Sequence, residues 1–317
     1  MARAVSKLGI EEIRQRYVRG DSLISARLLN QLRRDPRHGV RRIYELLKQR
    51  YERQRSEHLR LDAMLNFERV LWRSGVRHIA GVDEVGLGPL AGPVVAAAVV
   101  FPPGTALPGI DDSKRLDAEQ RTQAAAAIRA TAAGIGIGIA DIEEIDRLNI
   151  YQAGMLAMRR AVAALPVTPD HVLVDARTIP ELAMPQNAFQ KGDGINFSIA
   201  AASIIAKTHR DALMDELDRC YPGYAFARHK GYATAEHHAA VRRLGPCAIH
   251  RMSYPAIREV CGESSLRYYA FKERVAAADS AAALRRTEEE LAAAAAELQE
   301  YELRKLRLLV ARRWKIL

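Results

Sequence analysis

Four carboxylates lie where apolar segments end, and their positions suggest a metal site. Asp83 and Glu84 close one short apolar run, and Asp175 closes another. Asp211 follows the apolar helical segment 199–206. Grouped without a cation, carboxylates repel one another and some bind protons, whereas Mg²⁺ and Mn²⁺ prefer such oxygen ligands. If the four meet in space, two ions held by them would suit an in-line phosphoryl displacement.

Each carboxylate also has an ordinary structural interpretation. Asp83 or Asp175 can end a strand as a turn residue. Asp211 can pair with Arg210 or Lys207 along one helix face. For any single residue this interpretation is the better one. The metal hypothesis therefore depends on the four occurring together in their surrounding sequence.

The surrounding sequence resembles that of the ribonuclease HII family. Residues 81–95, which read Gly-Val-Asp-Glu-Val-Gly-Leu-Gly-Pro-Leu-Ala-Gly-Pro-Val-Val, resemble the family's opening signature. Further similar blocks follow in order: Asp112-Ser113-Lys114, Leu173-Val174-Asp175, Lys191-Gly192-Asp193, residues 200–207 with Arg210-Asp211, His229-Lys230-Gly231-Tyr232, and Gly245-Pro246-Cys247 with His250-Arg251. The similarity runs from about residue 78 to 257, and so many ordered blocks are far more specific than one short motif.

The resemblance implies an activity and a catalytic set. Asp83, Glu84, Asp175 and Asp211 would be the metal-binding catalytic carboxylates of a two-metal site that holds Mg²⁺ or Mn²⁺. The substrates would be RNA–DNA hybrids and duplex DNA that contains single ribonucleotides. Cleavage 5′ to the ribonucleotide would leave a 3′-hydroxyl and a 5′-phosphate, and the role would be ribonucleotide removal from DNA.

The resemblance also implies substrate contacts. RNA differs from DNA by its 2′-hydroxyl, and the backbone of Gly86-Leu87-Gly88 would sense it, because glycine has no Cβ to block close approach. Tyr232 would stack on the sugar at the RNA–DNA junction. The remaining contacts are to phosphates and would position the substrate rather than select it: Ser113, Lys114, Lys191 and Lys230. A simple turn, a half-buried tyrosine and solvated lysines are the ordinary alternatives.

Leu87 departs from the family pattern, which has arginine between the two glycines. An arginine there would supply a guanidinium to a phosphate, and leucine cannot. Losing one charge-assisted hydrogen bond costs on the order of 1.5–3 kcal/mol. We expect Leu87 to weaken substrate binding and the basic N-terminal segment to offset part of that loss.

Two other functions remain open from the sequence. One is a catalytically weakened nucleic-acid-binding protein on the same fold, which Leu87 and the terminal extensions would suit. The other is a different metal-dependent phosphodiesterase or nuclease, since a fold alone does not determine function. All four carboxylates are retained, which argues against the first, and the Gly-x-Gly loop with Tyr232 argues against the second.

The elements that must position these residues predict an α/β fold. Short apolar runs at 78–85 and 94–101, bounded by glycine and proline, predict the two strands of a hairpin. We expect further strands at 134–140 and 171–174, and helices at 117–132, 142–165 and 199–221. This order predicts a ribonuclease H-like core with a mixed central β-sheet flanked by helices, extended by helices at both ends.

Residues 1–77 are predicted to form a basic helical extension that precedes a catalytic domain at 78–262. Apolar residues recur at helical spacing on both sides of Asp35-Pro36, where the helix should break. Residues 1–78 contain 19 Lys or Arg against 9 Asp or Glu, so this segment carries the whole net charge of +10. A basic appendage on a neutral body suits a phosphate backbone, although a solvated basic helix face is an equal alternative.

Residues 263–317 form an Ala-rich tail that we expect to be helical. Leu284, Leu291 and Leu298 are spaced by seven, which is the lower limit for a coiled coil. A helix packed back on its own domain is the better interpretation, so we expect a monomer, with a dimerising coil as the weaker alternative.

The sequence predicts a cytoplasmic protein with no membrane segment. Its three cysteines lie far apart and form no CxxC pair, which favours a reducing compartment. The most apolar stretch, residues 88–101, is too short to span a bilayer, and no signal-peptide pattern opens the chain.

Overall fold

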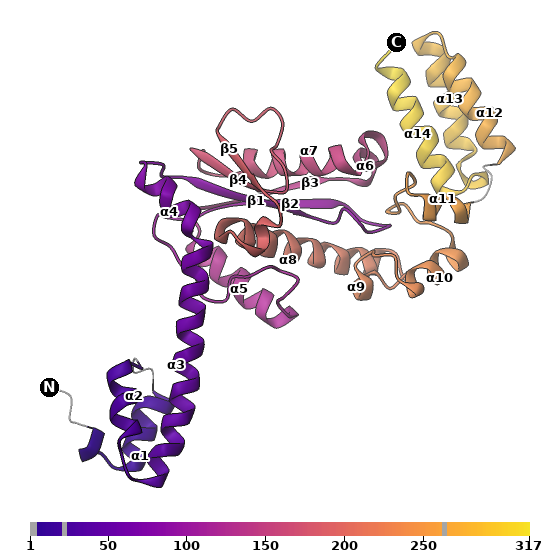
Figure 1. Cartoon of the computed structure of the whole chain (residues 1–317). Coiled ribbons are helices and arrows are strands. Elements are labelled where there is room, and N and C mark those ends of the chain that lie inside the picture. Colours follow the sequence, from indigo (N-terminus) through magenta and orange to yellow (C-terminus); the bar gives the residue numbers. More distant parts are fainter. Residues whose placement is uncertain (1–4, 21–23, 262–264) are drawn as a thin grey trace. The chain divides into compact units, whose positions relative to one another are not determined.

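The computed structural model describes residues 5–20, 24–261 and 265–317 (Figure 1). It divides the chain into two compact units. The smaller comprises Met1–Phe67 with Ala106–Gly109, and the larger comprises Glu68–Thr105 with Ile110–Leu317. The smaller unit thus ends ten residues before the predicted boundary at 77. The other predicted boundary, near residue 262, lies outside the described residues.

The larger unit contains a five-stranded mixed sheet. Its order is β3-β2-β1-β4-β5, with β1 at Ile79–Val85, β2 at Val94–Val100, β3 at Gly134–Ala140, β4 at His171–Asp175 and β5 at Gln186–Phe189. β1, β2 and β3 pair antiparallel, whereas β1, β4 and β5 pair parallel. The predicted mixed sheet and its first four strands are confirmed. β5 was not predicted, because this edge strand is short and polar.

Helices cover both faces of the sheet. α7 (Ile150–Ala163) packs on one face and α8 (Phe197–Cys220) on the other, as Figure 1 shows. All seven residues of β2 are therefore buried. β3 alternates glycine with isoleucine because α7 lies very close to it. A Cβ on Gly136 or Gly138 would stand 2.0 Å from a carbonyl oxygen of α7.

The helix predicted at 142–165 is wrong as a single element. The structure has α6 (Ile142–Leu148) and α7, separated at Asn149. Asn149 takes a φ of 79°, which asparagine tolerates better than most residues. Its side-chain oxygen also accepts hydrogen bonds from the backbone of Tyr151 and Gln152, so it caps α7.

The other helices of the larger unit connect and support this core. They are α4 (Asn66–Arg73), which belongs to this unit from Glu68 onward, α5 (Ala118–Thr131), α9 (Phe226–His229), α10 (Ala235–Leu244) and α11 (Pro255–Cys261). α5 and α8 confirm the helices predicted at 117–132 and 199–221. Glu68 of α4 is fully buried and accepts hydrogen bonds from Asn196 and Ser198, which fixes the start of α8.

The smaller unit is helical, as predicted. It contains η1 (Val5–Lys7), α1 (Ile10–Ile13), η2 (Arg14–Arg19), α2 (Ala26–Arg33) and α3 (His38–Met64) around their own apolar core. The predicted break at Asp35-Pro36 is confirmed. Asp35 is buried there and pairs with Arg37, whose guanidinium holds the pKa of this carboxyl below its usual range.

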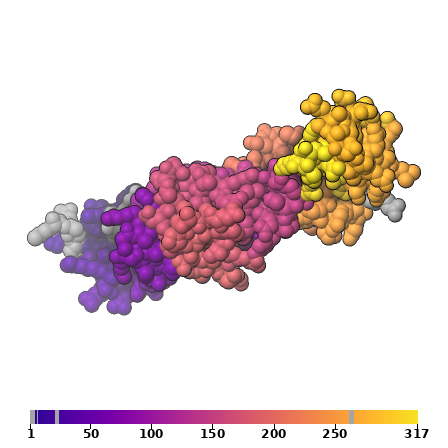
Figure 2. All heavy atoms as spheres, turned by 90° about the horizontal axis from the view of Figure 1, so that it is seen from above, coloured from indigo at the N-terminus to yellow at the C-terminus, as the bar shows by residue number. Residues whose placement is uncertain are grey.

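The tail folds into a helical bundle, α12 (Leu266–Ala277), α13 (Ala281–Ala293) and α14 (Glu300–Trp314), with the short turn η4 (Ala295–Glu297) before α14. Leu284, Leu291 and Leu298 are buried in its apolar core. A continuous heptad helix does not form, because α13 and α14 are separate helices. In Figure 2 the yellow surface of α14 adjoins the core, and Tyr301 of α14 is buried in the apolar cluster around α10 and α11.

Candidate active site

The parallel pairing of β1 and β4 brings Asp83 and Asp175 to one edge of the sheet. Val82 pairs with Val174, and each aspartate is the next residue of its strand. Both strands run in the same direction, so the two carboxylates leave the sheet side by side. Glu84 follows Asp83 on β1. We call Asp83, Glu84 and Asp175 the acidic edge.

Burial and mutual repulsion raise the pKa values of the acidic edge. Asp83 is only 5 % exposed, and burial, Glu84 and Asp175 raise its pKa well above the usual value. Burial and then Asp175 raise the pKa of Glu84 to about 7. Burial also raises the pKa of Asp175. These carboxylates lack enough nearby positive charge, which is the condition a bound cation would relieve.

Asp193 adds a fourth acidic group at this edge. It lies in the short helical turn η3 (Gly192–Gly194), and its charge raises the pKa of Asp83, Glu84 and Asp175. The backbone N–H of Gly192 donates to Asp175 Oδ1 at 2.6 Å, which fixes that turn beside β4. Asp193 was not predicted as a site residue, although the block Lys191-Gly192-Asp193 signalled it.

Asp211 behaves differently from the other predicted ligands. It lies on α8, and Lys207 Nζ donates to its carboxylate at 2.6 Å. The ordinary pairing considered from the sequence is thus present. Asp211 is not among the principal charges that raise the pKa values of the acidic edge. Within the described ranges, no three His, Cys, Asp or Glu side chains already stand in the geometry of a metal cage.

Arg251 stabilises the Gly86–Gly88 loop from the protein interior. The guanidinium is fully buried and donates to the carbonyls of Gly86 at 2.5 Å, Leu87 at 3.0 Å and Gly92 at 2.8 Å. Tyr254 also donates to the Leu87 carbonyl at 2.5 Å. The carbonyls are thus fixed inward. The Leu87 side chain is 37 % exposed.

Arg210 holds the neighbouring segments in the same way. It is fully buried and donates to the carbonyls of Ala91, Pro93 and Lys230. Gly86 has a φ of 97°, and a Cβ there would stand 2.4 Å from Arg210 Nε, so only glycine fits. Tyr232 is 40 % exposed, with the Arg210 guanidinium 5.8 Å from its ring centroid.

A buried pair of histidines extends this scaffold to Tyr232. The backbone N–H of Cys247 donates to His250 Nδ1, so the proton of neutral His250 is on Nε2. That nitrogen lies 3.0 Å from His237 Nε2, and His237 Nδ1 lies 2.9 Å from the Tyr232 carbonyl. The network assigns these tautomers. Burial lowers the pKa of His237 to about 4 and that of His250 to about 3, so both are neutral.

The predicted phosphate contacts differ in exposure. Ser113 is buried, and its hydroxyl lies 2.9 Å from that of Ser203, so it joins its loop to α8 and does not face solvent. Lys114 is well exposed and donates to Asp193 at 2.8 Å. Lys191 is exposed. Lys230 is mostly buried and pairs with Asp215.

Comparison with known proteins identifies the family. The family model for ribonuclease HII matches residues 80–257, and the model for the ribonuclease HII N-terminal domain matches residues 9–72. Ribonuclease HII of Myxococcus xanthus (strain DK1622) is 51% identical over 80% of this chain and 87% of that protein. The chain belongs to the ribonuclease HII family. Ribonuclease HII of Anaeromyxobacter sp. (strain Fw109-5) is 48% identical over 83% of this chain and 84% of that protein.

A solved structure, that of ribonuclease H2 from Pyrococcus horikoshii OT3, is 23% identical and covers 58% of this chain and 96% of that one. The TM-score between the two chains is 0.47. Membership of the ribonuclease HII family makes the chain an endoribonuclease of a metal-dependent family that acts on RNA–DNA hybrids. The predicted identity and enzyme class are confirmed.

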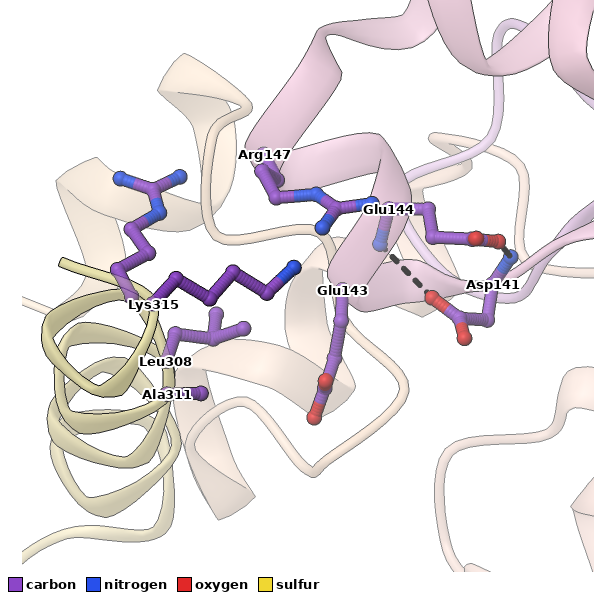
Figure 3. A pocket seen from close by; sticks show the side chains of 8 residues that line it. Asp141, Glu143, Glu144, Arg147, Leu308, Ala311 and Lys315 are labelled. Atoms are coloured by element: carbon purple, nitrogen blue, oxygen red, sulfur yellow. Dashed lines mark hydrogen bonds between the residues drawn. The ribbon is translucent and has the colours of Figure 1, made fainter.

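One surface pocket is formed by residues other than those of the predicted site. It has a volume of about 250 Å³ between α6 and α14, where Glu143 and Arg147 face Leu308, Ala311 and Lys315 (Figure 3). It contains none of the predicted catalytic or substrate-binding residues.

None of the described helices is both long and apolar enough to cross a membrane.

Proposed function

We propose that this chain hydrolyses RNA at ribonucleotides that are paired with or embedded in DNA, through a divalent-metal site at the acidic edge. The cut lies 5′ to the ribonucleotide and leaves a 3′-hydroxyl and a 5′-phosphate. One observation carries the proposal. The register of β1 and β4 puts Asp83, Glu84 and Asp175 at one edge of the sheet. Asp83 is buried, Glu84 and Asp175 are partly buried, and the charges of these two raise the pKa of Asp83. Such an uncompensated acidic group suits metal-assisted phosphodiester hydrolysis.

The chemistry of the acidic edge fits Mg²⁺ or Mn²⁺. Asp83, Glu84 and Asp175 offer the hard oxygen ligands that these ions prefer. Asp211 is the fourth proposed ligand, and it would have to exchange its ion pair with Lys207 for the metal. When bound, two such ions lower the pKa of the attacking water and stabilise the leaving 3′-oxygen.

The Gly86–Gly88 loop and Tyr232 are the proposed readers of the ribonucleotide. The loop's carbonyls are directed inward to Arg251 and Tyr254, and this fixes its backbone in one conformation. A fixed backbone can discriminate a 2′-hydroxyl by hydrogen bonding. The Tyr232 ring is partly exposed beside this loop, 3.9 Å from where a Cβ on Gly88 would stand, and it offers a stacking surface for the junction sugar.

The proposed phosphate contacts are Lys114, Lys191 and Lys230, with Ser113 supporting the loop of Lys114 from within. The helical unit is a further proposed contact with the duplex. Its basic side chains include Arg41, Arg42, Arg53 and Arg55, all exposed on α3. Exposed arginines on a unit whose basic residues outnumber its acidic ones suit non-specific phosphate binding.

We also propose that the chain is a monomer. The leucines at heptad spacing would be the natural contact of a dimerising coil, and they are instead buried in the tail's own apolar core. Sedimentation equilibrium tests this directly, and a dimer at micromolar concentration would contradict it.

The function is tested by cleavage of a DNA duplex that contains one ribonucleotide, with Mg²⁺ and with Mn²⁺, beside Asp83→Asn. A single cut 5′ to the ribonucleotide that disappears in the variant is the expected result. Cleavage of only a longer RNA–DNA hybrid would confine the activity to hybrids and implicate Leu87 in lost junction recognition. Cleavage of neither substrate with either metal would overturn the proposal in favour of nucleic-acid binding without catalysis.

A further inference from the structure

The segment that contains Arg251 determines the conformation of the Gly86–Gly88 loop. Besides the guanidinium contacts, its backbone pairs with the residues that follow the loop. The N–H of Gly92 donates to the carbonyl of Ile249, and the N–H of Arg251 donates to the carbonyl of Leu90, each at 2.9 Å. A shift of residues 248–253 would therefore be transmitted to the loop. We call residues 248–253 the Arg251 block.

The Arg251 block is itself held by an ion pair between two other elements. Asp146 of α6 pairs with Arg304 of the tail helix α14, and their side chains are 9% and 10% exposed. Asp146 accepts hydrogen bonds from the backbone N–H groups of Met252 at 3.1 Å and Ser253 at 2.9 Å. The carboxylate thus fixes the block on the C-terminal side of Arg251.

Arg304 fixes the block on the other side of Arg251. Its guanidinium donates to the carbonyl of Ala248 and, at 2.9 Å, to that of His250. The Arg304 Nε is buried without a hydrogen-bond partner. The other two guanidinium nitrogens contact these carbonyls and Asp146, and this position leaves Nε unsatisfied. Tyr301, one turn earlier on α14, is buried in the same apolar cluster as Ile249 and Met252.

We propose that Arg304 and Asp146 are positioning residues for ribonucleotide recognition, and that the tail is part of the recognition machinery. The Arg304–Asp146 pair sets the Arg251 block, and Arg251 sets the carbonyls of Gly86 and Leu87. This inference rests on the proposed role of the Gly86–Gly88 loop. The tail thereby affects substrate selection by stabilising the loop's conformation, and it does not contact the substrate.

The test uses the full chain with Arg304→Gln, Arg304→Lys and Asp146→Asn, and with Arg307→Gln as the matched control. Arg307 is exposed on the same helix. The first readout is amide hydrogen exchange in a peptide that covers residues 86–92. We expect exchange to be at least threefold faster in Arg304→Gln, intermediate in Arg304→Lys and unchanged in Arg307→Gln, with the strand at 94–100 unaffected.

The second readout is the ratio of kcat/KM for a duplex with one embedded ribonucleotide to that for a long RNA–DNA hybrid. A displaced loop should lower this ratio at least fivefold in Arg304→Gln and Asp146→Asn, because a long hybrid offers many 2′-hydroxyls. A merely structural role would lower both activities in proportion. Equal losses on both substrates, or wild-type exchange at 86–92, would overturn the inference.

The two proposals fail in different ways. A wild-type chain that cuts no ribonucleotide substrate would sink the proposed function, while the exchange readout would still decide whether Arg304 positions the loop. Should Arg304→Gln not fold, Arg304→Lys and Asp146→Asn give the same two readouts. Both keep part of the network and should shift the readouts in the same direction, Asp146→Asn by the fivefold given above and Arg304→Lys by less.

Discussion

The acidic edge and the Arg251 block both bury charge, but only the second compensates it. Arg251 is fully buried and donates to three backbone carbonyls. Asp83 is nearly as buried, yet its main electrostatic neighbours are other carboxylates, which raise its pKa. A buried charge that is hydrogen-bonded to fixed backbone dipoles stabilises the fold. A buried charge without such partners is available to bind a ligand. The contrast separates the proposed chemistry from the scaffold that presents it.

The largest expected effect is a loss of activity when one carboxylate of the acidic edge is replaced, while the fold stays intact. Asp83→Asn should lower kcat/KM by about a thousandfold, since a metal ligand supports several kcal/mol of transition-state stabilisation. The unfolding free energy should stay the same or rise, because the substitution removes a charge that its neighbours repel. Steady-state kinetics and urea denaturation measure the two quantities. A variant that loses stability but keeps activity would reverse our assignment of this region.

The opposite result is expected for the Arg251 block. Arg251→Ala should lower the unfolding free energy by roughly 3–5 kcal/mol, because buried carbonyls lose their donor and a cavity remains. Arg258→Ala, at an exposed position of α11, is the control and should change it by no more than about 0.5 kcal/mol. If both variants unfold alike in urea, Arg251 is not the support that its contacts indicate.

The buried histidines show a third way of burying a titratable group, which is to keep it neutral. The pKa values of His237 and His250 fall to about 4 and about 3, below the ordinary 6.5. Between these values the unfolded chain binds protons that the folded chain does not. The stability contribution is therefore complete above pH 6.5 and is lost as pH falls toward 4 and then 3, by about 1.4 kcal/mol per unit of pKa shift.

Urea denaturation between pH 7.5 and 4 measures this loss. His237→Gln should show a flatter pH dependence than the wild type over that range. His58→Gln, at an exposed position, should keep the wild-type slope. Parallel slopes in all three proteins would mean that the buried pair is not kept neutral by the fold.

The smallest effect concerns Leu87, which is partly exposed on the loop that Arg251 supports. Leu87→Arg should lower KM by roughly tenfold, which corresponds to about 1.5 kcal/mol from one added charge-assisted contact. The salt dependence of KM should become steeper, because one more phosphate is neutralised. An unchanged KM and salt slope would remove Leu87 as the cause of weaker binding, and Leu87→Met serves as the uncharged control.

Local sequence patterns were enough to predict the strands that carry Asp83 and Asp175. Apolar runs bounded by glycine and proline marked β1, β2 and β4, because strands buried on both faces leave that signature. β5 escaped notice because Gln186-Asn187-Ala188-Phe189 has no such run, and its pairing with β4 defines it as a strand. The break at Asn149 depended on one residue's φ within an otherwise helical pattern.

The supports of the site were out of reach for a different reason. Arg251 contacts Gly86 across 165 positions of sequence, and Arg304 contacts Asp146 across 158. Arg251 lies in one of the family-like sequence blocks, but nothing local indicates its partner, and nothing local distinguishes Arg304 from a solvated arginine. Asp193 likewise joins the acidic edge through the fold of η3 beside β4, and Asp211 pairs with Lys207 four residues earlier on its helix. Residue type and position, together with the family resemblance, proposed the four carboxylates, whereas tertiary packing selects their partners.

Binding of Mn²⁺ tests most directly the claim that the acidic edge is the uncompensated region. Glu68→Gln is a suitable control for Asp175→Asn, because Glu68 is a fully buried carboxylate that accepts three hydrogen bonds. Isothermal calorimetry should show binding to the wild type and to Glu68→Gln, and affinity weakened by at least roughly tenfold in Asp175→Asn. Equal affinity in Asp175→Asn and the wild type would contradict the account, as would a wild type that binds no Mn²⁺.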